Sequence, residues 1–563
     1  MYLKNKKVFT IEKIFINGQI YTLDKKNSIF EAMGITNGKI VFLGTNKGAI
    51  NASDNNTSII DLNHKTIIPG FIDAYIKIPE KIMMTEEDLN LFDCNTIEEC
   101  LDTVRKYINA HIDKDIIYGS GWDYNKFCKA PDKKLLNNIC SNKPIILRDI
   151  TGHMLWLNDR AFEYFEISKD SISSIGGGIE LDKNGELLGI LTDNAVRLIN
   201  MKEIYIYGDY INGLIKFQNN LHSYGITSIG LVENDSAYIP FDIYKEAERK
   251  DKLKLKINYG IYIYPYEIYH KTIYEQIHEL KRLNIIYKSR YFNITRACFE
   301  ADGLIEMHSA FLFKPYRNGN NAGKFKWDIL EFKEGVKMAN RLDFNAAIEC
   351  RGDNACKVAI DGIEYSQKNN NYSKFRNSIV HTDLITKYYI RRMKILGINA
   401  VIHPFWYYES NEHVENEYES IGEDRIQRLY PYKSLVENNI VTAASSDYYV
   451  SDEPNPIKGI WCAVTRNLYD FTNKSELNEN LMICPQYRLN PEEKVTVLDA
   501  VRSFTIDAAY ILGKEKEVGS IEYGKNADFV VLNKNIFESS IEEIPNIKVC
   551  RTYFDGELVY INE

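Results

Sequence analysis

The stretch Ile67-Ile68-Pro69-Gly70-Phe71-Ile72-Asp73-Ala74-Tyr75-Ile76-Lys77 decides the fold. Its Pro-Gly dipeptide favours a tight turn, and a short run of apolar and β-branched residues follows. A run of this kind, without polar alternation, is typical of a strand buried on both faces. Such strands usually lie in parallel sheets that helices cover. We therefore predict that this stretch provides a strand of a parallel sheet covered by helices.

The composition is that of a globular protein with no sign of a nucleic-acid or membrane partner. At 563 residues the chain is long enough for several lobes around one large domain. The net charge is -9 and there is no dense basic run, which argues against nucleic acid or an anionic membrane as the main partner. No run of ~18 apolar residues predicts a membrane span. The lysines of residues 1–10 are not followed by the apolar core of a signal peptide.

Cysteine usage points to a reducing compartment. The chain has 10 cysteines, no CxxC pair, and no spacing that matches a zinc ribbon or a disulfide framework. Disulfides are rare in the cytosol, where thiols are kept reduced. We therefore expect a cytoplasmic protein.

Both ends of the chain carry segments that favour antiparallel strands. Residues 11–62 contain Asn17-Gly18 and Asn37-Gly38, and the last segment contains Asp555-Gly556. These dipeptides favour the left-handed conformation that two-residue hairpin turns need. A further β-rich run covers residues 518–532. The simplest arrangement pairs the two ends in one β-rich lobe, with the bulk of the chain inserted between them.

The centre of the chain alternates between two patterns. From about residue 206 to residue 514, apolar strand-like runs alternate with amphipathic helical patterns, which predicts repeated strand–helix units and a parallel sheet. The clearest strands are at residues 225–229, 345–350, 377–381, 399–404 and 441–447. In barrels built from such units, the active site lies at the C-terminal ends of the strands. The residues that end these runs are therefore the candidates for a site.

The motifs resemble those of the amidohydrolase superfamily. The segment Pro69-Gly70-Phe71-Ile72-Asp73-Ala74 is similar to the first barrel strand of that superfamily, and residues 518–532 resemble its C-terminal motif. Four further motifs resemble, in order and spacing, the insertion of the amidohydrolase-3 (YtcJ-like) branch. These lie at residues 121–125, 152–158, 176–180 and 185–191. The resemblance covers nearly the whole chain.

The resemblance implies an α/β fold, a (β/α)8 TIM-type barrel with a discontinuous β-rich lobe and an insertion after barrel strand 1. We expect the N- and C-terminal segments, residues 1–66 and 515–563, to form the lobe. The barrel would then span residues 67–514, with the insertion at about 80–205. The resemblance also implies metal-assisted hydrolysis, in which a metal lowers the pKa of the attacking water and polarises the carbonyl.

Most of the family's metal-ligand positions are changed in this chain. The family uses a His-x-His pair, a lysine, two further histidines and an aspartate. Residue by residue, these six positions fall on Tyr75, Lys77, Cys298, Glu349, His381 and Asp447. Only His381 and Asp447 keep the family's residue type, so four of the six positions are substituted.

Two interpretations of this altered site stay open. In the first, Lys77 replaces the metal with a cation of its own, because buried carboxylates need a compensating charge. Asp447 or Glu349 then acts as the base, and His381 as the acid or oxyanion donor; Lys77 is an electrostatic clamp and no cofactor is expected. In the second, a single divalent metal such as zinc binds. Its candidate ligands are Glu349, His381, Asp447 and Cys298.

Four positions are candidates for substrate contacts: His153, Tyr75, Trp122 and His403. His153 belongs to the Gly-His motif and Trp122 to the Gly-Trp-Asp motif of the insertion. A structural role is the alternative for each, since tryptophans more often pack in cores and lone strand-end histidines are more often satisfied structurally.

We therefore predict an amidohydrolase-family enzyme that hydrolyses a non-peptide carbon–nitrogen bond in a small molecule, such as an amide, a formamide or a cyclic amide. A metal-free lyase, hydratase or isomerase on the same scaffold is a second hypothesis. A catalytically silent barrel that binds a small molecule or a partner protein is a third. The expected partner is a small-molecule substrate, and whether the chain forms a homodimer is left open.

Overall fold

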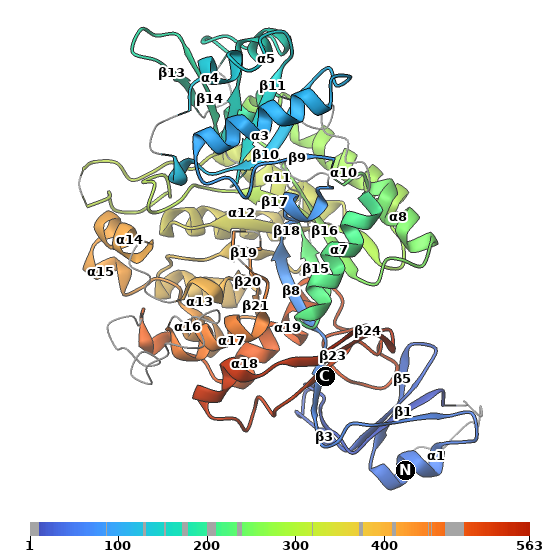
Figure 1. The fold of residues 1–563 in the computed structure, drawn as a ribbon. Coiled ribbons are helices and arrows are strands. Elements are labelled where there is room, and N and C mark those ends of the chain that lie inside the picture. The colour runs from blue at the N-terminus through green and yellow to red at the C-terminus, as the bar shows by residue number, and fades with distance from the viewer. Residues whose placement is uncertain are drawn as a thin grey trace.

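The computed structural model describes most of the chain. The described residues are 11–85, 87–127, 131–150, 152, 154–171, 178–199, 210–232, 239–317, 319–370, 375–407, 413–448, 450–451, 453–467 and 489–562. Three parts are stacked along one direction in Figure 1: a β-rich lobe beside the N-terminus, a barrel in the middle, and an insertion at the far end.

The central part is an eight-stranded parallel sheet curled into a barrel. Its strands are β8 (Phe71–Ile76), β15 (Ile226–Leu231), β16 (Lys256–Tyr262), β17 (Phe292–Glu300), β18 (Asn345–Cys350), β19 (Ser378–His381), β20 (Asn399–Ile402) and β21 (Thr442–Ala444). They are hydrogen-bonded in chain order from β8 to β21. This confirms the predicted (β/α)8 architecture, and each of the five strands read most clearly from the sequence overlaps one of these.

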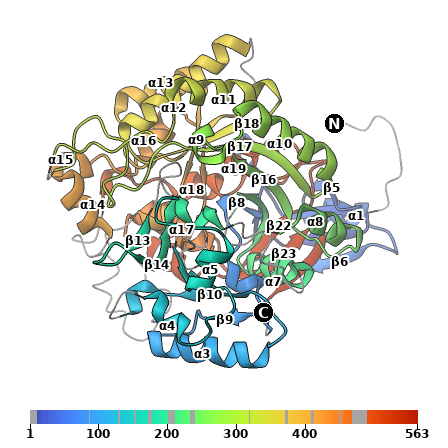
Figure 2. The same cartoon turned by 90° about the horizontal axis from the view of Figure 1, so that it is seen from above.

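Helices surround the barrel sheet, as Figure 2 shows from above. The longer ones are α7 (Tyr210–Ser223), α8 (Phe241–Arg249), α10 (Ile273–Tyr287), α11 (Ile329–Arg341), α12 (Asp353–Asn370), α13 (Lys387–Leu396) and α17 (Pro456–Thr465). Shorter helices include α14 (His413–Ile421), α16 (Tyr432–Glu437), α18 (Val497–Ser503) and α19 (Ile506–Ile511). Because helices cover the outside and side chains fill the inside, every residue of β8 is buried, as its unbroken apolar run predicts.

Side-chain contacts join the first and last strands of the barrel. Just after β21, the backbone N–H of Ser446 lies 3.1 Å from Asp73 Oδ2, and the hydroxyl of Ser446 donates to the same oxygen. The hydroxyl of Ser445 donates to the carbonyl oxygen of Tyr75, and the N–H of Lys77 donates to the carbonyl of Tyr448 at 2.6 Å. These contacts bring the end of β21 against the end of β8.

The two ends of the chain form the β-rich lobe together. One sheet contains β1 (Lys13–Ile16), β4 (Ala32–Thr36), β5 (Lys39–Gly44) and β6 (Ser58–Asp61). The other contains β2 (Gln19–Tyr21), β3 (Ile29–Phe30), β7 (Thr66–Pro69), β22 (Phe529–Leu532), β23 (Val549–Phe554) and β24 (Glu557–Ile561). Because β7 and β22 pair antiparallel, the predicted joining of both chain ends in one lobe is confirmed.

Two of the three expected hairpins are present. Asn37-Gly38 joins the antiparallel strands β4 and β5, and Asp555-Gly556 joins β23 and β24, with positive φ at all four residues. The hairpin expected at Asn17-Gly18 is wrong. Asn17 does adopt a positive φ of 55°, but β1 and β2, on either side of it, belong to different sheets.

The tight turn expected at Pro69-Gly70 is also wrong. Pro69 ends β7, where it lies opposite Phe529, and β8 begins at Phe71. The chain therefore passes extended from the lobe into the barrel. Gly70 is required there for close packing, because a Cβ atom at this position would lie 2.4 Å from Thr227 Oγ1.

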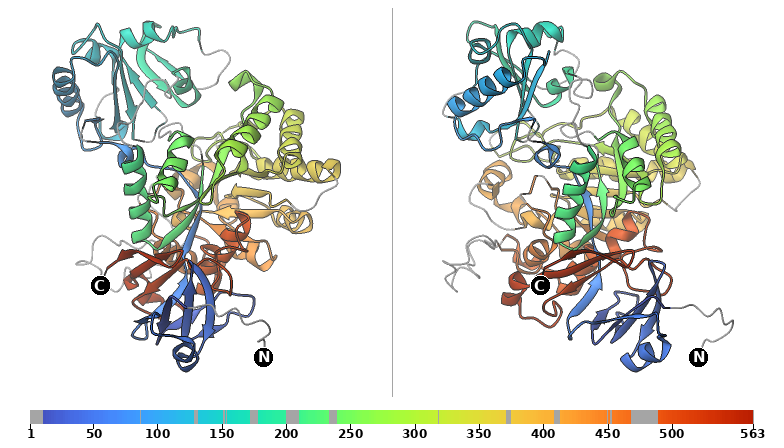
Figure 3. Two further views of the ribbon diagram at one scale, coloured as in Figure 1. Left: turned by 90° about the vertical axis from the view of Figure 1, so that its right-hand side faces the viewer. Right: turned by 45° about the vertical axis from the view of Figure 1, so that its right-hand side comes forward.

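The insertion between β8 and β15 carries its own six-stranded sheet. The strands are β9 (Leu89–Asn90), β10 (Ile117–Trp122), β11 (Ile145–Asp149), β12 (Met154–Leu157), β13 (Ile179–Leu181) and β14 (Leu187–Thr192), with α3 (Ile97–Ala110), α4 (Lys133–Asn137) and α5 (Asp159–Tyr164) beside them. Both views of Figure 3 place it at the opposite end of the barrel from the lobe. In the part of the chain that the structure describes, no helix is both long and apolar enough to cross a membrane.

Candidate functional site at the C-terminal end of the barrel

The strand ends bring most of the sequence-predicted site residues together. Tyr75 lies in β8 and Lys77 just after it, Glu349 lies in β18, His381 ends β19, and His403 and Asp447 follow β20 and β21. All of these except Lys77 are at least 95% buried. The cluster is therefore a mostly buried group of titratable side chains at the end of the barrel that β8 leaves to enter the insertion.

Two tyrosine hydroxyls hold the carboxylate of Glu349. Tyr75 and Tyr262 both donate to Glu349 Oε1, and their own hydroxyl oxygens are 2.5 Å apart. Burial, together with the neighbouring Glu349 carboxylate, raises the pKa of both tyrosines well above its usual value. Both therefore act as neutral donors, and Glu349 is the acceptor they share.

The imidazole of His381 accepts a hydrogen bond from an arginine. Arg351 Nη2 lies 3.0 Å from His381 Nε2. Because a guanidinium only donates, Nε2 must be the acceptor and Nδ1 must carry the ring proton. Burial lowers the pKa of His381 well below its usual value, and the positive charge of Arg351 adds to this effect. His381 is therefore neutral, so its 3.9 Å approach to Glu349 Oε2 is not an ion pair.

Arg351 is held from both its backbone and its side chain. Its N–H donates to Asp302 Oδ1 at 3.0 Å, and the N–H of Gly352 donates to Asp302 Oδ2 at 2.8 Å. Its Nε lies 3.9 Å from Asp383 Oδ2. Burial would lower the pKa of Arg351, but the carboxyl groups of Asp383 and Glu349 outweigh it and raise that pKa above its usual value. Arg351 is thus a permanent cation in the cluster.

A second cation faces Asp447. Lys77 Nζ lies 4.0 Å from Asp447 Oδ1, and the lysine side chain is 24% exposed whereas that of the aspartate is 3% exposed. Burial raises the pKa of Asp447 to about 6, although Lys77 and Arg351 oppose the increase. Among the described residues, Oδ1 of Asp447 has no hydrogen-bond partner. This carboxylate is therefore ionised near neutral pH and has an oxygen available to accept a proton.

Two neutral histidines and a tryptophan complete the cluster. The ring centroids of His381 and His403 are 4.4 Å apart, and those of His403 and Trp406 are 5.0 Å apart. Burial lowers the pKa of His403 well below its usual value, and Arg351 and Lys77 lower it further. The rings of Tyr75 and His403 are in a T-shaped arrangement, with their centroids 5.7 Å apart.

Of the other predicted site residues, Trp122 lies outside this group, whereas Cys298 is buried beside Tyr75 and Tyr262. Cys298 lies in β17 with its sulfur directed at Gly260, where an added Cβ atom would approach it to 2.6 Å. Trp122 lies in the core of the insertion and its indole N–H donates to the carbonyl of Leu147 at 2.9 Å. His153 lies outside the described residues. Trp122 is thus a core residue of the insertion, and Cys298 lies in the barrel interior.

The side chains of the cluster do not fit a divalent metal. The lone pair of His381 that would bind a metal accepts from Arg351, two hydroxyls occupy Glu349 Oε1, and Lys77 lies beside Asp447. No group of three or more His, Cys, Asp or Glu side chains that suits a metal ion occurs within the described ranges. The donor set instead matches a site built around protein cations.

Four residues of the cluster were not predicted as site residues from the sequence: Tyr262, Arg351, Asp383 and Trp406. The signal for two of them was present, because Tyr262 ends β16 and Arg351 comes directly after β18, so the same strand-end rule that selected Glu349 applies to them. Nothing in the sequence indicated that Arg351 reaches His381 on the neighbouring strand.

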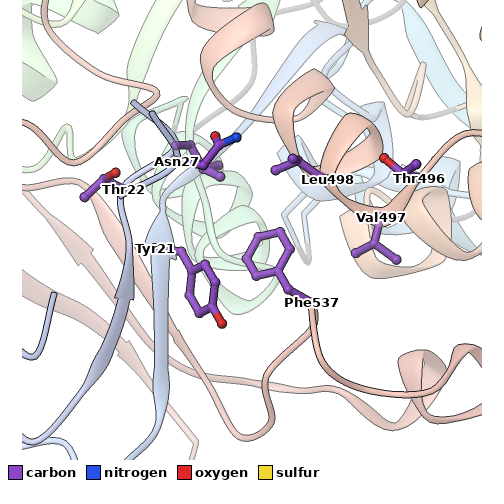
Figure 4. A pocket seen from close by; sticks show the side chains of 8 residues that line it. Tyr21, Thr22, Asn27, Thr496, Val497, Leu498 and Phe537 are labelled. Carbon is purple, nitrogen blue, oxygen red and sulfur yellow. The ribbon is translucent and has the colours of Figure 1, made fainter. Parts of the chain in front are cut away.

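A pocket lies away from this cluster, at the β-rich lobe. Figure 4 shows it where β2 of the lobe meets α18, with the rings of Tyr21 and Phe537 side by side at a centroid distance of 4.5 Å. Its volume is about 440 Å³, and its lining residues are Tyr21, Thr22, Leu23, Asn27, Thr496, Val497, Leu498 and Phe537. Since this lining contains no carboxylate, histidine or cysteine, the pocket lacks the acid–base groups found at the barrel end.

The fold and the strand-end cluster define a barrel enzyme scaffold, and comparison with known proteins assigns its family. A model of the amidohydrolase family matches residues 58–560. The chain therefore belongs to the amidohydrolase family, in its amidohydrolase-3 branch, as its motifs indicate. Family membership supports a hydrolase.

Similar proteins match over nearly their whole length. An N-substituted formamide deformylase of Arthrobacter pascens is 23% identical over 97% of this chain and 98% of that protein. The putative amidohydrolase YtcJ of Bacillus subtilis is 25% identical over 98% of this chain and 99% of its own length. A metal-dependent hydrolase of Pyrococcus horikoshii superposes with a TM-score of 0.71 at 22% identity, covering 94% of this chain and 99% of that one, which shows the common fold.

Proposed function

We propose that this protein hydrolyses a non-peptide carbon–nitrogen bond of a small molecule, with Asp447 as the base and protein cations in place of a metal. The observation that carries the proposal is the pairing of Asp447 with Lys77. A buried carboxylate that is ionised near neutral pH, 4.0 Å from an ammonium group and with one oxygen unpartnered among the described residues, suits a catalytic base.

The proposed reaction uses groups that already face one another. Asp447 takes a proton from water as the water oxygen bonds to the carbonyl carbon. The positive charges of Lys77 and Arg351 stabilise the resulting oxyanion. Both charges reach this site, since both oppose the raised pKa of Asp447 and lower the pKa of His381. The carbon–nitrogen bond then breaks, and the carboxyl group of Asp447 returns the proton to the leaving nitrogen. The neutral imidazole of His381 presents its Nδ1 proton as a further donor.

The family and one relative support the proposed substrate class. The Arthrobacter pascens protein is a deformylase of N-substituted formamides, so we propose formamides and related small amides as the first substrates to test. The side chain of Lys77 is 24% exposed, so we propose that the substrate enters along it.

A silent binding protein is the second candidate, and a specific contact favours it. Both Tyr75 and Tyr262 donate to Glu349 Oε1, so this oxygen already has two hydrogen-bond partners without any ligand. A barrel end closed by such internal hydrogen bonds can bind a small molecule without transforming it.

The test is a hydrolysis assay with N-substituted formamides, linear amides and cyclic amides, in which mass spectrometry detects the amine and acid products. The purified full chain is compared with Asp447→Asn, which keeps the shape of the side chain but removes the base. We expect Asp447→Asn to lower kcat/KM by about 10²–10⁴-fold, the usual contribution of a general base.

Asp507→Asn is the matched control, because it makes the same change on α19, outside the cluster. Its activity should stay within about twofold of the unmodified protein, as expected for a site with no part in proton transfer. Full activity in Asp447→Asn would refute the proposed base. Ligand-induced thermal stabilisation without any turnover would favour the silent binding protein.

A further inference from the structure

We propose that Arg351 is the resident cation of this site and that it keeps a divalent metal from binding His381 and Glu349. The proposal concerns the same cluster as the proposed hydrolysis and rests on it for its chemical meaning. It makes a separate claim, however, because metal binding is measured without any substrate.

The first argument is the occupancy of a lone pair. A neutral imidazole binds a metal through its unprotonated nitrogen, which in His381 is Nε2. That nitrogen accepts from Arg351 Nη2 at 3.0 Å. The other ring nitrogen, Nδ1, carries the proton. A metal can therefore reach His381 only if the guanidinium leaves.

The second argument is that Arg351 is anchored. Asp302 accepts hydrogen bonds from the backbone N–H groups of Arg351 and Gly352 at 3.0 and 2.8 Å. Asp302 itself is buried, with no exposed surface. On the side chain, Nε of Arg351 faces Asp383 at 3.9 Å. The backbone of Arg351 and its guanidinium group thus each have a carboxyl group beside them. This favours the position in which the guanidinium contacts His381.

The third argument is charge. A divalent ion at His381 and Glu349 would share the cluster with two cations, since Arg351 contacts His381 and Lys77 lies 4.0 Å from Asp447. At these short distances and this degree of burial, like charges repel strongly. Glu349 can offer a metal ion little more than Oε2, because two tyrosine hydroxyls already donate to its Oε1.

The proposal predicts a latent metal site. If Arg351 is removed, His381 Nε2 is freed and lies 3.9 Å from Glu349 Oε2, a separation that one metal ion can bridge at ordinary ligand distances of about 2.0–2.2 Å. Both side chains are buried and supported by neighbouring strands, so the pair is preorganised. The unmodified protein should lack this site.

The experiment titrates the metal-stripped full chain with Co²⁺, whose visible absorption reports nitrogen and oxygen ligands. The proteins are the unmodified chain, Arg351→Ala, Arg351→Met, His381→Ala, the double variant Arg351→Ala with His381→Ala, and Arg428→Ala. Arg428 is the matched control, because it lies 3.8 Å from Asp353 and outside the cluster. Circular dichroism and thermal unfolding establish that each variant is folded.

We expect at least tenfold tighter Co²⁺ binding in Arg351→Ala than in the unmodified chain, loss of that gain in the double variant, and no gain in Arg428→Ala. Arg351→Met keeps the bulk of the side chain without its charge and serves where Arg351→Ala does not fold. One equivalent of Co²⁺ bound by the unmodified chain and lost in His381→Ala would overturn the proposal. Failure of both folded Arg351 variants to gain a site would overturn it as well.

The titration separates this proposal from the proposed function. Hydrolytic activity that does not depend on Asp447 would refute the proposed mechanism and leave the Co²⁺ result unchanged. A metal site in the unmodified chain would refute the role of Arg351, whatever the activity assay shows.

Discussion

The carboxylate of Asp73 in β8 accepts hydrogen bonds from both the backbone N–H and the hydroxyl of Ser446, just after β21. Burial raises the pKa of Asp73 to about 7, although the hydrogen bonds from Ser446 oppose the increase. The contact joins the first and last barrel strands directly before Asp447. The same residues that close the barrel therefore place the proposed base opposite Lys77.

Replacing Ser446 by alanine should weaken this junction. The variant leaves a buried carboxylate with one hydrogen bond fewer, which costs about 1–3 kcal/mol. We expect a lower midpoint of thermal unfolding by calorimetry. Ser168→Ala, at an exposed position, is the control and should unfold at the original temperature. An unchanged midpoint in Ser446→Ala would show that the contact contributes nothing to closure.

His222 should make the protein sensitive to acid. Burial lowers the pKa of His222 from 6.5 to about 4, so between these values the unfolded chain binds more protons than the folded one. Stability therefore rises with pH across this window and is lost as the pH falls through it. In His222→Gln, whose side chain does not titrate, the dependence of the unfolding midpoint on pH between 4 and 6.5 should be weaker.

The control for His222 is His278→Gln, because His278 is exposed. It should keep the pH dependence of the unmodified protein. The same pH dependence in His222→Gln would place the acid sensitivity in other groups.

Removing the ammonium of Lys77 should slow the proposed reaction. Lys77→Met keeps much of the side-chain volume but removes the charge that stabilises the oxyanion, a change that costs about 10²–10³-fold in kcat at comparable sites. The measurement is the steady-state rate with the best substrate from the assay above. Lys81→Met, whose side chain is 53% exposed, should retain activity. A fully active Lys77→Met would assign the oxyanion to Arg351 alone.

Lys256 should hold the lobe to the barrel. Its ammonium lies 2.6 Å from Asp528 and 2.7 Å from Asp555, so a residue of β16 binds two carboxylates of the C-terminal segment. Lys256→Met leaves both carboxylates without this partner, and breaking a buried pair costs about 3–5 kcal/mol. We expect a marked drop in the unfolding midpoint, with Lys250→Met as the exposed control. Equal midpoints would contradict this role.

Strand positions in the barrel were predictable because burial on both faces leaves a local mark. The prediction of a strand at residues 345–350 coincides with β18, and the Asn37-Gly38 hairpin follows from the left-handed backbone preference of those two residues. The errors at Asn17-Gly18 and Pro69-Gly70 have different causes. At Asn17-Gly18 the backbone adopts the expected positive φ, but the local pattern does not say which sheet the following strand joins. At Pro69-Gly70 the local turn preference is overridden by strand pairing, because Pro69 pairs with Phe529 and the chain continues directly into β8.

The sequence by itself predicted the barrel strands and the pairing of the two chain ends, and its family motifs predicted the barrel that these strands form. The same resemblance aligns Tyr75, Lys77, Cys298 and Glu349 with metal-ligand positions of the family. The strands depend on short-range periodicity, whereas the alignment depends on residue identity within the motifs. Only the tertiary structure decided that Arg351 contacts His381, that Tyr262 shares Glu349 with Tyr75, and that Trp122 packs inside the insertion. These contacts join residues on different strands or bury a side chain in a particular core, and their geometry depends on register and side-chain direction, which no local pattern encodes.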